Sequence, residues 1–152
     1  MMSHKSRYLD VIYCDDIRNE VGNKFSFMGI YTRELTIPNP TLLPKLCIAV
    51  KVVTDIDDPL ESITVRVVKI NNGKEVELLS TDSLPLPSLT DTPARDCDTT
   101  CMLLQMQFVL SPFQIEEDAT IRVKATTERE ELIGAALRLR RGYRKFCVQG
   151  IT

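Results

Sequence analysis

The chain has 152 residues, of which 43% are hydrophobic and 26% charged, and its formal net charge is −2. This composition is too apolar and too weakly charged for an intrinsically disordered protein, and no apolar run reaches the roughly 18 residues of a membrane span. Valine, isoleucine and threonine make up a quarter of the chain, which favours β-sheet. We therefore expect a single domain, residues 1–152, that is large enough to bury a hydrophobic core without help from disulfides or metal ions.

The termini and the cysteines indicate the compartment. The first ten residues lack the apolar segment of a signal peptide, and we expect residues 1–7 to be a frayed tail. The five cysteines are an odd number, which argues against a disulfide framework and predicts a cytoplasmic protein. Cys97 and Cys101 stand in a polar segment, where pairing and metal binding both stay open. A structural zinc site usually needs four ligands and His4 is the single histidine, so we expect no cofactor.

Alternation of apolar and polar residues predicts strands in the first half of the chain. Residues 8–17 read as a strand that runs into a turn at Asp15-Asp16. Residues 24–31 place Phe25, Phe27 and Tyr31 on one face. Further strands are predicted over 46–54 and 63–70, and Asn71-Asn72-Gly73-Lys74 then offers the positive φ angles of a hairpin turn before a strand over 75–79.

The second half of the chain shows the same period. Residues 102–110 form the cleanest half-buried strand, and residues 121–125 form another. Residues 128–141 fit both a helical stripe and a strand with Arg138 and Arg140 outward. Gly134 and the neighbouring strands favour a strand preceded by a turn, while the helix stays open as the alternative.

About eight short strands, separated by turns every 8 to 15 residues, predict an all-β fold. We expect an antiparallel β-sandwich of the immunoglobulin-like or C2-like kind. The Cys–Trp–Cys core of a true immunoglobulin domain is impossible because the chain has no tryptophan. The longest predicted loop, residues 84–98, is rich in proline, and loops of this length are often binding elements.

Catalytic chemistry has little support in the sequence. Covalent catalysis usually pairs a nucleophile with a histidine base, and His4 lies in the predicted tail. The six glycines lie far apart, so no phosphate-binding loop is formed. We expect a protein that is not an enzyme.

Two segments are the candidates for binding a protein partner. The proline-rich loop presents Leu84, Leu86 and Leu89 on a stiff backbone that suits docking. The C-terminal part is basic: residues 1–118 hold 11 Lys/Arg against 18 Asp/Glu, whereas residues 119–152 hold 8 against 3. The basic candidates for orienting an acidic partner are Arg138, Arg140, Arg141, Tyr143, Arg144 and Lys145. A homo-oligomer is a further option, and no membrane is expected as a partner.

Two other ligands are the runner-up hypothesis. Aspartates at predicted loops could gather as oxygen ligands for calcium, the candidates being Asp15, Asp16, Asp55, Asp57 and Asp58. Aspartates also populate turns for their own hydrogen bonds. The basic strip with its aromatic residues could bind nucleic acid, but a net-acidic chain with nine aromatic residues is poorly suited to this.

The stretch from Cys14 to Tyr31, Cys-Asp-Asp-Ile-Arg-Asn-Glu-Val-Gly-Asn-Lys-Phe-Ser-Phe-Met-Gly-Ile-Tyr, is followed by Leu-Pro-Lys-Leu-Cys-Ile at 43–48. It resembles a family of small bacterial and prophage-borne proteins of unknown function. The resemblance implies a cytoplasmic, phage-related β protein, and such proteins often act by blocking or bridging a host protein. The family brings no catalytic residues to this chain.

Overall fold

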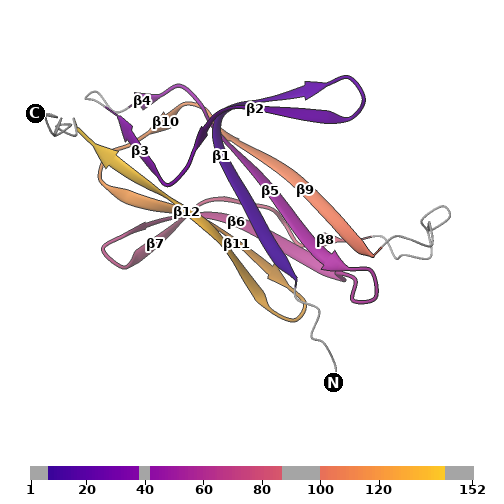
Figure 1. Cartoon of the computed structure of the whole chain (residues 1–152). Coiled ribbons are helices and arrows are strands. Elements are labelled where there is room, and N and C mark those ends of the chain that lie inside the picture. Colours follow the sequence, from indigo (N-terminus) through magenta and orange to yellow (C-terminus); the bar gives the residue numbers. More distant parts are fainter. Residues whose placement is uncertain (1–6, 38–41, 87–99, 143–152) are drawn as a thin grey trace, which may run out of the picture.

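The computed structural model describes residues 7–37, 42–86 and 100–142, which fold into two large β-sheets packed face to face and one small two-stranded sheet (Figure 1). Sheet A has the order β2 (Lys24–Tyr31), β1 (Tyr8–Glu20), β5 (Leu46–Asp55) and β9 (Cys101–Leu110). Sheet B has the order β3 (Glu34–Ile37), β12 (Glu131–Arg141), β11 (Ala119–Thr127), β6 (Ser62–Asn71) and β7 (Lys74–Ser80), with β8 (Leu84–Pro85) also paired to β6. The short strands β4 (Leu42–Leu43) and β10 (Phe113–Gln114) pair with each other.

The predicted all-β sandwich is confirmed. Apart from β2, the seven long strands are β1, β5, β6, β7, β9, β11 and β12 in chain order. The first, second and fifth of these (β1, β5 and β9) lie in sheet A, and the other four lie in sheet B. Constant-type immunoglobulin domains divide their strands in the same way, except that their fourth strand joins the first sheet. The prediction of purely antiparallel pairing needs one correction, because β3 runs parallel to β12 from Glu34↔Arg138 to Ile37↔Arg141. The chain leaves sheet A after β2 and crosses to sheet B, so β3 arrives there in the same direction as the last strand.

The core lies between the sheets and is built from alternate residues of their central strands. On β5, Leu46, Ile48, Val50 and Val52 are buried, and on β11 the inward set is Ile121, Val123 and Ala125. Period-two alternation puts each such set on one face of its strand, so burying that face covers all its apolar residues together. At about 25 cal/mol per Å² of buried apolar surface, this aliphatic core is the main source of stability.

The ambiguous segment 128–141 forms a turn followed by strand β12, as the preferred interpretation predicted. Gly134 lies where β12 meets β1 of the other sheet, since a Cβ at this position would come within 2.5 Å of Val11 Cγ2. Next to this contact, the hydroxyl of Tyr13 on β1 donates a 2.6 Å hydrogen bond to the carbonyl of Ala135 on β12. A glycine is therefore needed here for the close approach of the two sheets.

Two turn predictions had different outcomes. The hairpin between β6 and β7 is confirmed, with φ of 47° at Asn72 and 75° at Gly73. The turn at Asp15-Asp16 was wrong, because β1 continues through both aspartates to Glu20. The chain reverses instead around Gly22 and Asn23, which have φ of 86° and 56°. The aspartates stay in the strand because their carboxylates find partners there.

The expected frayed tail was wrong at its last residue. Arg7 is 5% exposed and is held by several acceptors, while residues 1–6 lie outside the described part. The predicted loop 84–98 also begins with structure, since Leu84 and Pro85 pair with Ile63 and Ser62 of β6. Leu86 packs against the core. Within the described ranges no helix has the length and apolar character to cross a membrane.

Candidate interaction site: the open edge of sheet A

Strand β9 forms one edge of sheet A, beside β5 (Figure 1). Its ten residues, Cys-Met-Leu-Leu-Gln-Met-Gln-Phe-Val-Leu, include no charge, no proline and no glycine. Leu103 and Val109 are each 52% exposed on the outer face. Natural edge strands are usually blunted by charge, proline, a bulge or a covering segment. In the described part of the chain no strand pairs with the outer edge of β9. The strand itself contains no charge, no proline and no bulge.

The pairing with β5 determines which backbone groups of β9 face outward. The register is unbroken from Asp55↔Cys101 to Leu46↔Leu110, and just beyond it Ile56 N donates a 3.0 Å hydrogen bond to the carbonyl of Thr100. Successive residues of an antiparallel strand direct their backbone groups to opposite sides. Even-numbered residues therefore bond to β5, and the odd-numbered residues 101–109 direct their N–H and C=O groups to the open edge.

A groove of about 150 Å³ lies beside this edge on the outer face of sheet A. The β1–β2 hairpin, residues 15–31, projects from the sandwich (Figure 1), and we call it the arm. The arm supplies Phe25 and Phe27 to the groove, and the floor comes from β1, β5 and β9. Its other side-chain lining residues are Asp10, Ile12, Ala49, Lys51, Gln105 and Gln107. The outward-facing glutamines of β9 thus belong to both the edge and the groove.

Polar contacts fix the base of the arm. The Asp15 carboxylate lies over Gly29 and accepts a hydrogen bond from the Tyr31 hydroxyl. Burial and this carboxylate raise the pKa of Tyr31 above its ordinary value, so the phenol stays protonated. Asp16 accepts from Lys45, and that hydrogen bond lowers the pKa of the Asp16 carboxyl. The arm is therefore anchored by charge-assisted bonds at its root.

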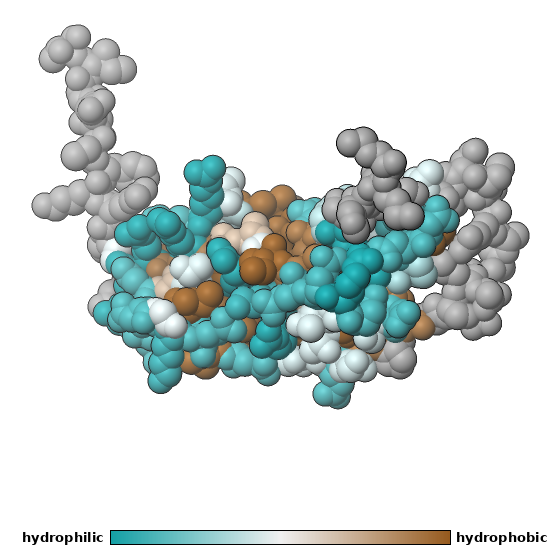
Figure 2. Space-filling view, turned by 90° about the horizontal axis from the view of Figure 1, so that it is seen from below, coloured by the Kyte–Doolittle hydropathy of each residue, from teal (hydrophilic) through white to brown (hydrophobic). Residues whose placement is uncertain are grey.

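Exposed apolar area alone does not identify a site on this protein. In the face shown in Figure 2, several separate apolar patches lie among hydrophilic residues. Large exposed apolar side chains occur on many elements, among them Tyr8, Val21, Met28, Val76 and Ile133. Scattered apolar residues are normal on protein surfaces. The other edge strands of the two sheets in the described part of the chain, β2, β3 and β7, each contain a charged residue, so the absence of charge distinguishes the edge of β9 from them.

The five aspartates predicted as calcium ligands lie in two separate places. Asp15 and Asp16 follow the Cys14↔Cys47 pair at the start of β5, whereas Asp55 ends β5 and Asp57 and Asp58 follow it. Asp16 and Asp58 are paired with cationic side chains. In residues 7–37, 42–86 and 100–142, no group of three or more His, Cys, Asp or Glu residues could hold a metal ion. The structure does not assemble these aspartates into one site.

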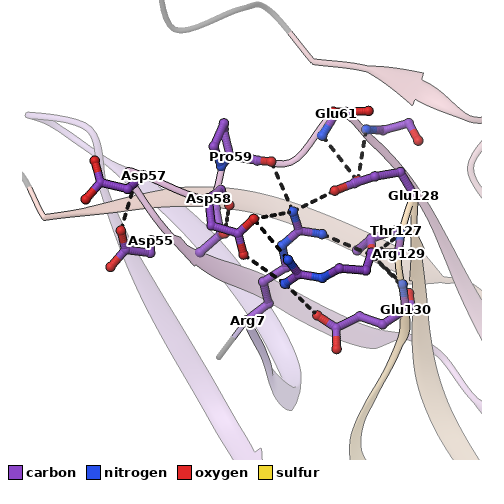
Figure 3. A network of polar contacts seen from close by, with 12 residues as sticks. Arg7, Asp55, Asp57, Asp58, Pro59, Glu61, Thr127, Glu128, Arg129 and Glu130 are labelled. Atoms are coloured by element: carbon purple, nitrogen blue, oxygen red, sulfur yellow. Dashed lines mark hydrogen bonds and ion pairs between the residues drawn. The ribbon is translucent and has the colours of Figure 1, made fainter. Parts of the chain in front are cut away.

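Asp58 belongs to a polar cluster around Arg7 (Figure 3). The Arg7 guanidinium contacts Glu128 at 2.6 Å and Asp58 at 3.3 Å, and it donates to the carbonyl of Pro59 at 3.0 Å. Its side chain is 1% exposed. Arg129 donates to both carboxylate oxygens of Asp58, at 3.1 and 2.8 Å, and these bonds lower the pKa of Asp58. The cluster joins the start of β1 to two loops, which indicates a structural role.

The predicted basic strip is only partly described and partly neutralised. Tyr143, Arg144 and Lys145 lie outside the described residues. Arg140 forms a 3.1 Å ion pair with Glu34 of β3, and the Arg141 guanidinium donates to the carbonyl of Glu116. Arg138 and Arg140 line a polar hollow of about 270 Å³ that also contains Asn71, Asn72, Asp118 and Thr120. This hollow carries both signs of charge and lacks the character of a phosphate-binding strip.

The two predicted partner-binding segments do not meet. Leu84 is 37% exposed and pairs with Ile63 at the start of β6, and Leu89 lies outside the described residues. Arg138 pairs with Thr120 of β11, which in turn pairs with Ile70 near the end of β6. The loop and the basic strip therefore lie at opposite ends of sheet B. The described residues of the two candidate segments therefore do not adjoin one another.

The cysteines divide by environment. Cys14 and Cys47 are buried and face each other across β1 and β5. Burial raises the pKa of the Cys14 thiol to about 11, and burial also raises the pKa of Cys47, so neither is a reactive thiolate at neutral pH. Cys101 is exposed at the start of β9, and Cys97 lies outside the described residues.

Sequence reasoning identified β9 as a strand but not as a binding edge. One signal was available: residues 99–115 contain no charged side chain, in a chain where charged residues make up 26%. Strand order was also needed, because the same residues in a central strand would only indicate a buried position. A scan against protein-family models finds no match, and no curated protein matches the chain.

Proposed function

We propose that this protein is a non-enzymatic protein-interaction module that takes up an extended strand along the edge of β9. The observation that carries the proposal is the ten-residue uncharged edge, whose odd-numbered residues direct their backbone groups outward. In β-strand addition, such backbone groups supply affinity and neighbouring pockets supply specificity. The edge of β9 provides the backbone groups, and the groove provides the neighbouring pocket.

The groove suits an apolar side chain with a polar neighbour. Phe25 is 39% exposed, and Phe27 and Ile12 add further apolar walls beside Gln105 and Gln107. A strand added to β9 directs alternate side chains to the outer face of sheet A, next to these residues. Asp10 and Lys51, which are register partners on β1 and β5, supply one charge of each sign at the floor. The fitting segment is therefore extended, largely uncharged and apolar at alternate positions.

The calcium and nucleic-acid hypotheses gain less support. The candidate aspartates are separated and partly bound to cations, and the described arginines of the basic strip are largely engaged by acceptors. A phage-related origin, a host protein as the target and a cytoplasmic location stay predictions that rest on the sequence alone.

A peptide-display selection on the immobilised full-length protein tests the proposal. We expect enrichment of uncharged peptides with alternating apolar residues. Gln105→Pro removes an outward N–H without removing a bond to β5, so it should abolish their binding while the fold persists. Gln105→Thr keeps the N–H and the neutral side chain and should bind normally. Peptides that bind the proline variant as well as the unchanged protein, or a selection without enrichment, would refute strand addition at β9.

A further inference from the structure

We infer that the strand that β9 takes up is β9 of a second copy of this chain, paired antiparallel about a two-fold axis at Met106. The inference rests on the proposed function, because it names the occupant of the same edge. A two-fold pairing is self-complementary, so each contact is made twice. It requires a strand that matches its own reversed sequence, and β9 has that property.

On the outer face, the register centred on Met106 places apolar residues opposite apolar residues and amides opposite amides. Leu103 of one copy then lies opposite Val109 of the other, and Gln105 lies opposite Gln107. The two exposed apolar residues, each 52% exposed in the single chain, cover one another. The glutamine side chains can exchange amide hydrogen bonds. All four residues direct their backbone groups outward, so they form hydrogen-bonded pairs between the copies.

The same register also buries apolar side chains on the inner face of β9. Leu104, Met106, Phe108 and Leu110 are only partly buried although they pack against the core. Pairing about Met106 places Leu104 opposite Phe108 of the second copy, and Met102 opposite Leu110. These apolar side chains then extend the core of one sandwich towards that of the other, which removes further apolar surface from water.

Neighbouring registers match the outer side chains of the two copies less well. Centring the axis on Gln105 sets Leu103 against Gln107 and Val109 against Cys101, and centring it on Gln107 sets Val109 against Gln105. Each mixes apolar residues with amides across the open face. A shift by one residue in a single strand would direct inner residues outward, which the half-buried inner row opposes.

The distribution of charged residues in sheet A also allows a second copy to pair at this edge. Lys51 of β5 pairs with Gln105, and Asp10 of β1 pairs with Lys51, so these two charges of the described sheet stay at least one strand away from the junction. In the paired sheets Gln105 separates Lys51 from Gln107 of the second copy. Among the described residues no like charges lie opposite each other in this pairing, whereas like charges on directly opposed residues would destabilise it.

Charge exchange across the register provides the decisive test. Sedimentation equilibrium of the full-length protein should show a dimer. Leu103→Glu and Val109→Lys should each raise the dimer dissociation constant at least about tenfold, because a charge then faces an apolar residue. The double variant should restore dimerisation, since each Glu at position 103 then faces a Lys at position 109. Its dimer should weaken as salt rises.

A disulfide test reports the register independently. Met106 and its symmetry mate form a non-hydrogen-bonded pair, whose Cα atoms are about 4.5 Å apart in antiparallel sheets and suit a disulfide. With Cys97 and Cys101 replaced by serine, Met106→Cys should cross-link under mild oxidation, whereas Leu104→Cys should not. A wild-type protein that stays monomeric at high concentration, or a dimer unaffected by Leu103→Glu, overturns the inference. If peptides still bind in a manner abolished by Gln105→Pro, strand addition at β9 stands with a different occupant.

Discussion

The carboxylate of Asp15 occupies the space into which a Cβ at Gly29 would project. Asp15 on β1 and Gly29 on β2 face each other across the root of the arm, and the same carboxylate accepts a hydrogen bond from Tyr31. Gly29 also has φ of 66°, a conformation that residues with a Cβ rarely adopt. The arm, and with it one wall of the groove, therefore depends on a glycine at this position.

Gly29→Ala should lower the free energy of unfolding by about 2 kcal/mol or more. Roughly 1 kcal/mol comes from the positive φ and the rest from the overlap with Asp15. Gly73→Ala is the matched control, because Gly73 has φ of 75° and a Cβ added there would have no heavy atom within 4 Å. Urea unfolding of both variants gives the comparison. Equal losses would show that the Asp15 carboxylate moves aside at no cost.

Gly134→Ala tests the contact between the sheets. Its Cβ would meet Val11 Cγ2 at 2.5 Å and Leu9 Cδ2 at 3.2 Å. We expect a loss of about 1–3 kcal/mol, which is typical of overpacking in a close-packed interior. Adding Val11→Ala should recover part of that loss, whereas the same change alone should destabilise by leaving a cavity. Additive losses in the double variant would mean that the two side chains do not compete for space.

Arg7→Met should cost about 2–4 kcal/mol, because it removes the buried guanidinium, 1% exposed, from Glu128 and leaves Asp58 with Arg129 alone. This range begins lower than the roughly 3–5 kcal/mol for fully buried pairs, since the two carboxylates are 30% and 23% exposed. Arg18→Met is the control: Arg18 is 61% exposed and its ion pair with Asp16 should contribute less than about 1 kcal/mol. Chemical unfolding measures both, and equal losses would contradict a structural role for the Arg7 cluster.

Acid should weaken the fold through Asp58. The hydrogen bonds from Arg129 lower its pKa in the folded state, so its contribution is complete above the unfolded pKa of about 3.9 and is lost as pH falls through the lower folded value. Asp58→Asn removes this titration. Urea unfolding between pH 2.5 and 7 should show a stability difference between the two proteins that shrinks with acid below about pH 4. A difference that does not change with pH would contradict the assignment.

The alternation of residues was sufficient to predict seven of the eight principal strands and the sandwich, whereas residues 128–141 also fitted a helix and needed Gly134 and the neighbouring strands to be assigned. Strand β9 shows why alternation suffices elsewhere: Leu104, Met106 and Phe108 alternate with Gln105 and Gln107, and this period fits an extended chain with one face covered. The short strand Glu34–Ile37 was not predicted, because four residues give too little periodicity and its partner lies about a hundred positions away in the sequence.

The candidate site depended on strand order, which local pattern does not contain. The sequence by itself determined that residues 102–110 are extended, uncharged and two-faced. Only the tertiary structure placed this strand at an edge, turned its odd-numbered backbone groups outward and brought Phe25 of the arm beside Gln105 and Gln107. The physical reason is that alternation reports which face of a strand is buried, whereas an edge is defined by hydrogen bonds to residues far away in the chain. The same limit explains why the sequence could not show that the candidate segments containing Leu84 and Arg138 lie at opposite ends of sheet B.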